Sequence, residues 1–583
     1  MGARELRPAR ESIAAPGAVT VALTLAAYLI AAWGFALPMS FISDDWQILA
    51  RVRTASFLEL WGGQDLLWSW WRPWSRELHF WTLFRGAGAN EIAFHAASFA
   101  LWLAVLVMFH ALARRIAGAR VAALACAGLA ALAAWSGTLL WAAGVQDLWM
   151  LAWVLAFLHA FASRRTVLAL VALAGALLSK ETAAVAPALA LVWAMLAERE
   201  RLTAALRRIA PSVVMGAGWF LAHPTLRERL LEPERLGVEF ATKSAPVLIV
   251  AAKTVLAAFN LQYLPKPESG WLAALVPALP GIAIVTALAA WAVFGRERAT
   301  RNLAPPLAAA RPAAFGAAWA AIAWAPLQLP WIDWHDYYGL LGAMGAWLAA
   351  ATVLARTPAL AVAVVLGVAT LQPAQANTNV WSFSASFYQR RQAHFVGRLR
   401  SELLRIHPRL PSHARLHFTR VPHSIGLGYA WFSPAFSVWY SDSTIGGGFW
   451  SSYRPRAAGV PAAPDYFFRY DSTSGRWAEV VKGPEDIAAA RAADPLWRDD
   501  HRELAALFAR AEDWPATALE YAKLYAAYPD SVEFAFDAAI ASEVAGDMAA
   551  AARGYAEVLA SPRASDDQRS FARGYELRAG RRP

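Results

Sequence analysis

Long apolar runs, separated by short arginine-rich segments, dominate the first 375 residues of the chain. A run of roughly twenty apolar residues is long enough to cross the hydrocarbon core of a bilayer as a helix. The pattern predicts about eleven transmembrane helices, and hence a polytopic α-helical membrane protein. The predicted runs cover residues 17–38, 92–113, 120–136, 148–162, 166–179, 182–197, 209–223, 271–294, 313–330, 336–354 and 357–373.

Arginines between these runs indicate how the chain is oriented, because short cytoplasmic loops carry an excess of Lys and Arg. If the N-terminus is cytoplasmic and the sides alternate, every arginine cluster falls in the cytoplasm. The clustered residues are Arg4, Arg7, Arg10, Arg114, Arg115, Arg120, Arg164, Arg165, Arg199, Arg201, Arg207, Arg208, Arg296, Arg298, Arg301, Arg311 and Arg356. Abundant Ala and Arg with few Lys is typical of a GC-rich bacterial genome. We therefore expect a multi-pass protein of the bacterial inner membrane with a periplasmic or extracellular C-terminal part.

Two apolar runs test this alternation. Residues 245–260 are short for a span and include Lys253, and a span there would move the arginines after residue 294 outside. We expect an outer interfacial helix over about 245–260. Residues 166–197 divide into two short helices at Lys180, each of about fourteen residues and about 21 Å, less than the hydrocarbon core of about 30 Å. Lys180 and Glu181 should therefore lie below the outer membrane surface.

The apolar runs stop near residue 375, so residues 1–375 form one predicted domain, whose first outer loop covers 39–91. Residues 376–490 have the pattern of a soluble α+β segment. An amphipathic helix over 387–407 precedes strand-like segments, and Gly475 marks the turn of a hairpin.

Residues 491–583 are helical and repetitive in pattern. Asp513 matches Asp547 and Tyr521 matches Tyr555, both at a spacing of 34 residues. That spacing is the tetratricopeptide period. The chain is therefore predicted to end in a short tetratricopeptide-like helical repeat.

Composition agrees with a membrane protein and excludes several classes of function. Of 583 residues, 58% are hydrophobic and only 17% are charged, which is atypical of a soluble enzyme. The net charge of +11 comes from short clusters between apolar runs, so we expect no nucleic-acid partner. The single Cys126 excludes an intramolecular disulfide, and the absence of a tight ligand cluster in the sequence predicts no metal.

Polar residues recur at the predicted outer ends of the helices. Carboxylates and cations around a lipid-accessible cavity suit transfer from an anionic lipid carrier, which requires a base for the acceptor and positive charge for the departing phosphate. Taken singly, each group also fits an ordinary structural role, such as a solvated acid pair or an interfacial histidine. The recurring residues are Asp44 and Asp45 after the first run, Arg72 and Arg76 in the first loop, Asp147 in the second, Lys180 and Glu181 in the third, and His335 and Tyr338 in a later loop.

The order and spacing of these groups resemble the polyprenyl-phosphate-sugar-dependent glycosyltransferases of the GT-C superfamily, and most closely the transmembrane and tetratricopeptide O-mannosyltransferases. The resemblance covers about residues 17–350 and the repeats, whereas residues 377–490 have no counterpart in it. The matching elements are the acid pair Asp44 and Asp45, the "WRP" with Arg72 and Pro73, the "FH" of Phe94 and His95, Asp147, and the "LLSKE" that ends in Lys180 and Glu181.

The resemblance implies an inverting transfer of a sugar from a polyprenyl monophosphate to an acceptor hydroxyl on the outer face of the membrane. It implies Asp44 as general base, Asp45 as its positioning neighbour and Asp147 as a further catalytic residue. The implied donor-phosphate ligands are Arg72, Lys180, Arg76 and His335, and the implied supporting residues are Glu181, His95 and Tyr338. It implies no cofactor and no metal. The expected partners are the lipid-linked sugar as co-substrate, membrane lipid, and a protein or glycan acceptor at the repeats.

Two other classes of function fit parts of the pattern. A transporter or flippase of lipid-linked saccharides would also hold polar groups near the membrane, but it needs charges distributed across the bilayer and commonly repeated halves. A non-catalytic scaffold that presents the repeats to partners would tolerate Asp44→Asn. The sequence favours the glycosyltransferase without specifying its sugar or its acceptor.

Overall fold

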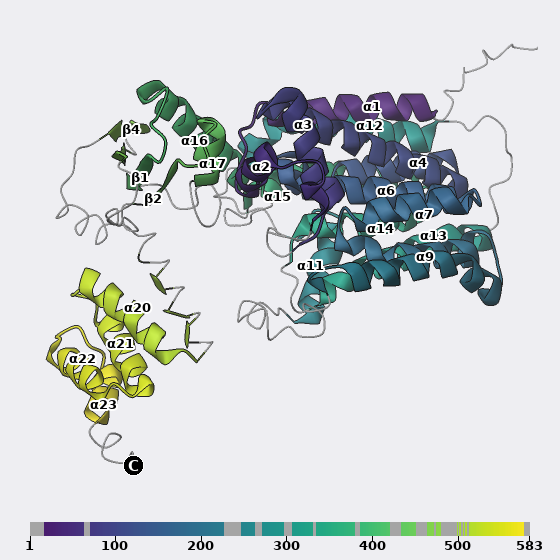
Figure 1. The fold of residues 1–583 in the computed structure, drawn as a ribbon. Coiled ribbons are helices and arrows are strands. Elements are labelled where there is room, and N and C mark those ends of the chain that lie inside the picture. Colours follow the sequence, from purple (N-terminus) through teal and green to yellow (C-terminus); the bar gives the residue numbers. More distant parts are fainter. Residues whose placement is uncertain are drawn as a thin grey trace, which may run out of the picture. The chain divides into compact units, whose positions relative to one another are not determined.

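The computed structural model divides the chain into two compact units, Met1–Leu230 with Lys243–Gly397 and Leu231–Thr242 with Arg398–Pro583. Figure 1 shows the elements of both. Predictions about the N-terminal arginines, the cluster from Arg296 to Arg301, and residues 480–490 lie outside the described residues. The described residues are 17–62, 70–226, 246–262, 271–295, 306–329, 334–378, 385–419, 433–449, 463–471, 474–479, 498, 501–502, 505–506, 508–509 and 512–575.

The first unit is built from helices, and each predicted apolar run falls on helical residues. The α-helices are α1 (Ala18–Trp33), α2 (Asp44–Thr54), α3 (His79–Ala87), α4 (Glu91–Ala130), α5 (Ser136–Leu139), α6 (Val145–Ala162), α7 (Thr166–Leu177), α8 (Ala186–Val192), α9 (Leu202–Ala222), α11 (Val247–Ala257), α12 (Trp271–Phe294), α13 (Pro306–Trp324), α14 (Leu340–Leu354) and α15 (Pro358–Thr378). Short helical turns are η1 (Gly34–Ala36), η2 (Glu59–Trp61), η4 (Pro73–Leu78), η5 (Ala133–Trp135), η6 (Ala142–Gly144), η7 (Glu181–Val185), η8 (Trp193–Ala197), η12 (Ala325–Gln328) and η13 (Asp336–Gly339).

Among the described residues, six helices are long and apolar enough to cross a membrane, judged by length and composition. They are Ala18–Ala36, Glu91–Ala130, Ala142–Ala162, Leu272–Phe294, Asp336–Leu354 and Pro358–Gln375. The higher count of about eleven spans stays a prediction. Part of the difference is α4, which contains two of the predicted runs. At Gly118, φ is 86°, a conformation that glycine adopts readily, and Cys126 Sγ lies 3.7 Å from the carbonyl oxygen of Leu106. The two legs of α4 therefore pack side by side.

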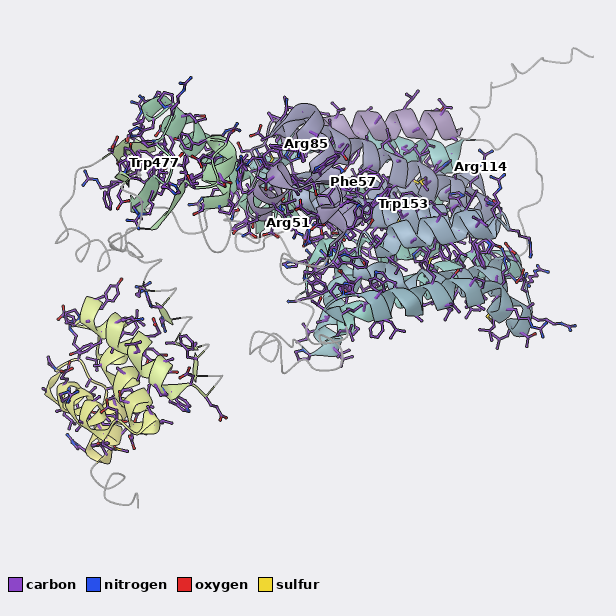
Figure 2. All side chains as sticks on the ribbon, in the orientation of Figure 1. Arg51, Phe57, Arg85, Arg114, Trp153 and Trp477 are labelled. Atoms are coloured by element: carbon purple, nitrogen blue, oxygen red, sulfur yellow. The ribbon has the colours of Figure 1, made fainter. Side chains whose placement is uncertain are left out.

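Large aromatic side chains are among the fully buried residues of the first unit. Figure 2 shows the side chains on the ribbon, with Trp153 labelled in this unit. Trp135, Trp319 and Trp347 are fully buried. A Cβ atom at Gly128 would come within 2.0 Å of the Trp347 ring, so α4 and α14 approach closely because position 128 has no side chain. The indole N–H of Trp347 also donates to the carbonyl oxygen of Ala258 at 2.8 Å, which satisfies its polar atom inside the core.

Polar contacts join the helix ends of the first unit in two groups. In one group, the ring of His95 bridges the carbonyl oxygens of Met39 and Leu139 at 3.2 and 3.1 Å. In the other, Arg120 donates to the carbonyl oxygen of Gly295 at 3.3 Å. Each contact joins chain ends that the alternating-side prediction places on the same side, so the contacts agree with that alternation.

The helix break predicted at Lys180 is present. α7 ends at Leu177, Lys180 is extended with φ −163° and ψ 144°, and η7 begins at the next residue. The helix expected near 245–260 is α11, which is not among the six long apolar helices. Thr254 on α11 accepts a hydrogen bond from the indole of Trp334 at 2.9 Å, so α11 packs against the segment that precedes η13.

The β-rich part of the second unit follows α16 (Ser386–Ile406), the predicted amphipathic helix. Its elements are β1 (Arg415–Thr419), α17 (Ser433–Trp439), β2 (Gly446–Phe449), β3 (Asp465–Asp471) and β4 (Arg476–Glu479). The sheet order is β2-β1-β3-β4, with β1 parallel to β2 and β3, and β3 antiparallel to β4. Gly475 turns the β3–β4 hairpin at φ 64°, as predicted.

The helical part of the second unit contains α20 (Trp514–Ala527), α21 (Val532–Ala545), α22 (Met548–Ala560) and α23 (Asp566–Arg573). The matched residues Asp513 and Asp547 have the same function: each side chain accepts a hydrogen bond from a backbone N–H in the first turn of the helix that follows. The repeated sequence positions therefore also occupy equivalent positions in the structure. The identification as a tetratricopeptide repeat stays a prediction.

Candidate functional site

The acid pair lies at the start of α2, directly after a strained residue. Ser43 has φ 52° and ψ −122°, an uncommon conformation for a residue with a side chain. The carboxylate of Asp45 accepts the backbone N–H of Ile42 at 2.9 Å and that of Ala143 at 2.7 Å, one on each oxygen. Ala143 belongs to η6 in the second loop. The hydrogen bond between Asp45 and Ala143 therefore links the start of α2 to the second loop.

The two acids differ in exposure. Asp45 is 1% exposed, and burial raises its pKa to about 8 against the opposing effect of its two backbone hydrogen bonds. Asp44 is partly exposed and accepts a hydrogen bond from the Ser43 hydroxyl at 3.3 Å. Of the pair, Asp44 is thus the more exposed acid, and both oxygens of Asp45 accept backbone hydrogen bonds.

Asp45→Asn should lower the thermal stability of the protein. An amide has one oxygen for two backbone donors, and its own NH₂ would face the second N–H, which leaves a buried donor unsatisfied at a cost of about 1–3 kcal/mol. We expect a lower apparent Tm and a partial loss of any activity. Asp44→Asn is the matched control and should leave Tm unchanged, so equal Tm values for both variants would contradict the positioning role of Asp45.

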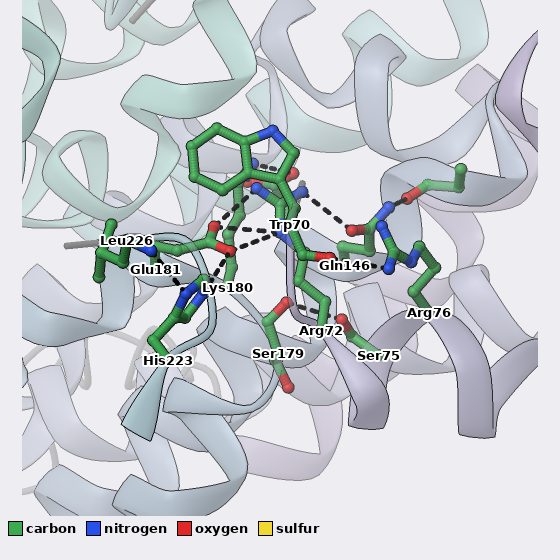
Figure 3. Close-up of polar contacts among 12 residues, drawn as sticks. Trp70, Arg72, Ser75, Arg76, Gln146, Ser179, Lys180, Glu181, His223 and Leu226 are labelled. Carbon is green, nitrogen blue, oxygen red and sulfur yellow. Dashed lines mark hydrogen bonds and ion pairs between the residues drawn. The ribbon is translucent and has the colours of Figure 1, made fainter. Parts of the chain in front are cut away.

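Arg72 and Glu181 form the centre of the site (Figure 3). The Arg72 guanidinium donates to Glu181 through Nε at 3.0 Å and Nη2 at 2.6 Å, and through Nη1 to Gln146 at 2.9 Å. Its cationic group also lies 5.0 Å from the ring centroid of Trp70. Arg72 is therefore held in a fixed orientation by groups from the second and third loops.

Lys180 and Asp147 form a second ion pair beside the first. The Lys180 ammonium lies 2.7 Å from both carboxylate oxygens of Asp147, and both side chains are buried. The ammonium also lies 4.1 Å from the ring centroid of Tyr338. The structure thus brings Asp147, Lys180 and Tyr338 together, and the roles predicted for them stay predictions.

Short hydrogen bonds unite the loops that carry these groups. The Gln146 amide donates to the carbonyl oxygen of Ala143 at 2.8 Å, so the loop that holds Asp45 also contacts Arg72. In the first loop, the Ser75 hydroxyl donates to the carbonyl oxygen of Ser179 at 2.7 Å. Hydrogen bonds therefore run from Asp45 through Ala143, Gln146 and Arg72 to Glu181, the residue that follows Lys180 in the chain.

Arg76 and His335, both predicted to bind the donor phosphate, make their contacts outside the Arg72–Glu181 and Lys180–Asp147 ion pairs. Arg76 is buried, and it donates to Glu77 at 2.7 Å and to the carbonyl oxygen of Trp70 at 2.8 Å. This placement favours a structural role over the predicted phosphate contact. His335 stacks on Tyr337, with ring centroids 5.5 Å apart, and lies edge-on to Tyr338. Its link to Lys180 therefore runs through the rings of Tyr337 and Tyr338, whose centroids lie 5.3 and 4.1 Å from the ammonium.

His95 lies between the first and second loops, and the supporting role predicted for it stays a prediction. Its ring is buried and bridges the first loop, at Met39, to the second loop, at Leu139. Among the described residues, no group of three or more His, Cys, Asp or Glu side chains could hold a metal ion.

The structure adds Gln146 and His223, neither of which the sequence singles out. Gln146 precedes Asp147 in "GVQDLW", and its proximity to that residue was the available signal. His223 follows the last residue of α9, and its Nε2 lies 3.8 Å from Glu181 Oε1. No local motif surrounds His223, because its partner lies 42 positions earlier in the chain.

No family model and no curated protein matches this sequence. Among solved structures, ArnT from Cupriavidus metallidurans bound to undecaprenyl phosphate is 16% identical, with a TM-score of 0.39 over 79% of this chain and 94% of that chain. ArnT from the same organism in the apo state is 17% identical, with a TM-score of 0.32 over 72% and 84%. Similarity at this level assigns no function.

Proposed function

We propose that this protein is a membrane glycosyltransferase of GT-C type that transfers a sugar from a polyprenyl monophosphate to an acceptor hydroxyl. One observation carries the proposal: two cations, the largely buried Arg72 and the buried Lys180, lie in loops that hydrogen bonds join to Asp45, and Asp45 is the chain neighbour of the partly exposed carboxylate Asp44. The loop pattern that resembles the GT-C superfamily supports the same reading.

The chemistry follows from the side chains. The Arg72 guanidinium suits bidentate contact with a phosphate, and the Lys180 ammonium adds a point charge. Asp44 removes the proton of the acceptor hydroxyl, whose oxygen attacks the anomeric carbon from the face opposite the phosphate. The bond between the anomeric carbon and the phosphate oxygen breaks with inversion, and lipid phosphate leaves with the electron pair.

The remaining features belong to the same proposal. The protein belongs to the bacterial inner membrane, its C-terminal part is periplasmic or extracellular, and its helical repeats engage a protein or glycan acceptor. The reaction uses no cofactor and no metal.

The position of the ion pairs favours an enzyme over a transporter. In the described part of the first unit, ion pairs gather at the site and in a second cluster, where Arg164 and Arg208 contact Glu198 and Glu200. By the alternation of the helices this second cluster lies at the opposite ends. A path for a charged saccharide would need polar groups between the two ends.

Arg72→Gln should reduce kcat/KM for the donor by roughly 10²- to 10³-fold, because one preorganised donor to the leaving phosphate is lost. The measurement is transfer by the purified full-length protein from a panel of labelled polyprenyl-phosphate sugars. Arg72→Gln together with Glu181→Gln keeps the local charge balanced and should show the same loss.

Arg208→Gln provides a matched control. The Arg208 side chain is 15% exposed against 14% for Arg72, and it also pairs with carboxylates, Glu198 at 2.5 Å and Glu200 at 2.8 Å. We expect near-normal turnover in this variant. Equal losses in Arg72→Gln and Arg208→Gln, or transfer from no donor of the panel by the unmodified protein, would contradict the proposed function.

A further inference from the structure

His223 is held rigidly in one ring orientation. Its side chain is 0% exposed, and its Nδ1 accepts the backbone N–H groups of Thr225 at 3.3 Å and Leu226 at 3.0 Å. The rings of Trp71 and Trp219 lie edge-on to it, with centroids 5.9 and 5.3 Å away. Because Nδ1 accepts hydrogen bonds, the ring proton lies on Nε2.

That Nε2–H donor points toward Glu181 without reaching it (Figure 3). The separation from Glu181 Oε1 is 3.8 Å, beyond hydrogen-bond range. Within the described part of the chain, Nε2 of His223 is buried and has no hydrogen-bond partner. A buried donor without an acceptor is uncommon in folded proteins and calls for an explanation.

Glu181 is fully engaged with Arg72, and this engagement conflicts with donor binding. Three contacts of 3.2, 3.0 and 2.6 Å join the guanidinium to the Glu181 carboxylate. A phosphate that binds Arg72 through the same N–H groups must displace Glu181. The Glu181 side chain is only 12% exposed, and a largely buried carboxylate that loses its cation carries a desolvation penalty unless another donor receives it.

We propose that His223 receives the Glu181 carboxylate when the donor phosphate takes its place on Arg72. A movement of about 1 Å by Glu181 Oε1 would bring it into hydrogen-bond range of Nε2. His223 is then a positioning residue that lowers the cost of donor binding and touches neither the sugar nor the acceptor. This inference rests on the proposed function, because it requires a phosphate at Arg72.

The test is the affinity of the purified full-length protein, in lipid nanodiscs, for undecaprenyl phosphate, which carries no sugar. His223→Phe keeps an aromatic ring between Trp71 and Trp219 but has no N–H. His223→Asn keeps an acceptor for the Thr225 and Leu226 N–H groups but cannot reach Glu181. Both variants should raise Kd roughly tenfold, the effect of losing one hydrogen bond to a charged group. His223→Gln, whose amide reaches the Nε2 position, should bind nearly as well as the unmodified protein.

A second background separates this role from a purely structural one. In Glu181→Gln no charge has to be relocated, so adding His223→Phe or His223→Asn should leave Kd unchanged. Tenfold losses in both backgrounds, or normal affinity in His223→Phe and His223→Asn alone, would overturn the inference. If the unmodified protein binds no undecaprenyl phosphate, the proposed function itself fails. The single variants His223→Phe and His223→Asn will then show no binding either.

Discussion

Asp44→Asn should reduce the turnover number by roughly 10²- to 10⁴-fold, the usual cost of losing a general base. Asparagine keeps the size of the side chain and an oxygen for the Ser43 hydroxyl, while it removes the basicity. The measurement is the initial rate at saturating donor and acceptor. Because Asp44 is the more exposed acid of the pair, the substitution should change the chemical step rather than the fold.

Controls for this variant come from the rest of the site. Membrane insertion, apparent Tm and Kd for undecaprenyl phosphate should all be normal in Asp44→Asn, since Arg72 and Lys180 are unchanged. Near-normal turnover in Asp44→Asn, in Asp45→Asn and in the double variant would exclude this pair as the base. Either Asp147 would then be the general base, or the protein would be a non-catalytic scaffold.

Lys180→Ala should be among the most damaging single substitutions in the first unit. It leaves the Asp147 carboxylate buried without its cation, and breaking a buried ion pair from one side costs about 3–5 kcal/mol. We expect a marked fall in apparent Tm and in the yield of monodisperse protein. Lys180→Met combined with Asp147→Asn removes both charges and should restore most of the stability.

The restored double variant isolates the functional contribution. If Lys180 holds the donor phosphate, the KM for the lipid-linked donor should rise in this variant while the KM for the acceptor stays close to normal. A variant that is stable and has an unchanged donor KM would show that the ion pair serves the fold alone. A rise in acceptor KM only would place Lys180 near the acceptor instead.

The loops that carry the site could be predicted from the sequence, because the ends of the helices are visible in the apolar pattern and alternating sides place these loops on one side of the membrane. The pairings within the site could not be predicted. Adjacent Lys180 and Glu181 suggest an ion pair with each other, yet Lys180 binds Asp147 and Glu181 binds Arg72. The extended backbone at Lys180 explains this, because successive side chains of an extended segment point to opposite sides.

Arg76 and His223 show the same limit of local pattern. Arg72 and Arg76 are four positions apart, a spacing that places both on one face of a helix, but η4 begins only at Pro73 and Arg72 has φ −132° and ψ 55°. Arg76 donates to Glu77 and does not lie beside Arg72 on a helix face. His223 depends on a partner in a different loop, and only the packing of α9 against α7 and α8 brings the two together.

The brevity of α7 has a consequence for the surrounding lipid. Its twelve residues rise only about 18 Å, well short of a hydrocarbon core of about 30 Å. If α7 crosses the membrane as the sequence predicts, this hydrophobic mismatch would be relieved by local thinning of the bilayer, at a cost that grows with each ångström of added thickness. The protein would therefore be more stable in thin bilayers of short-chain lipids than in thick ones. Lipid chain length would then influence which membranes of the cell contain it.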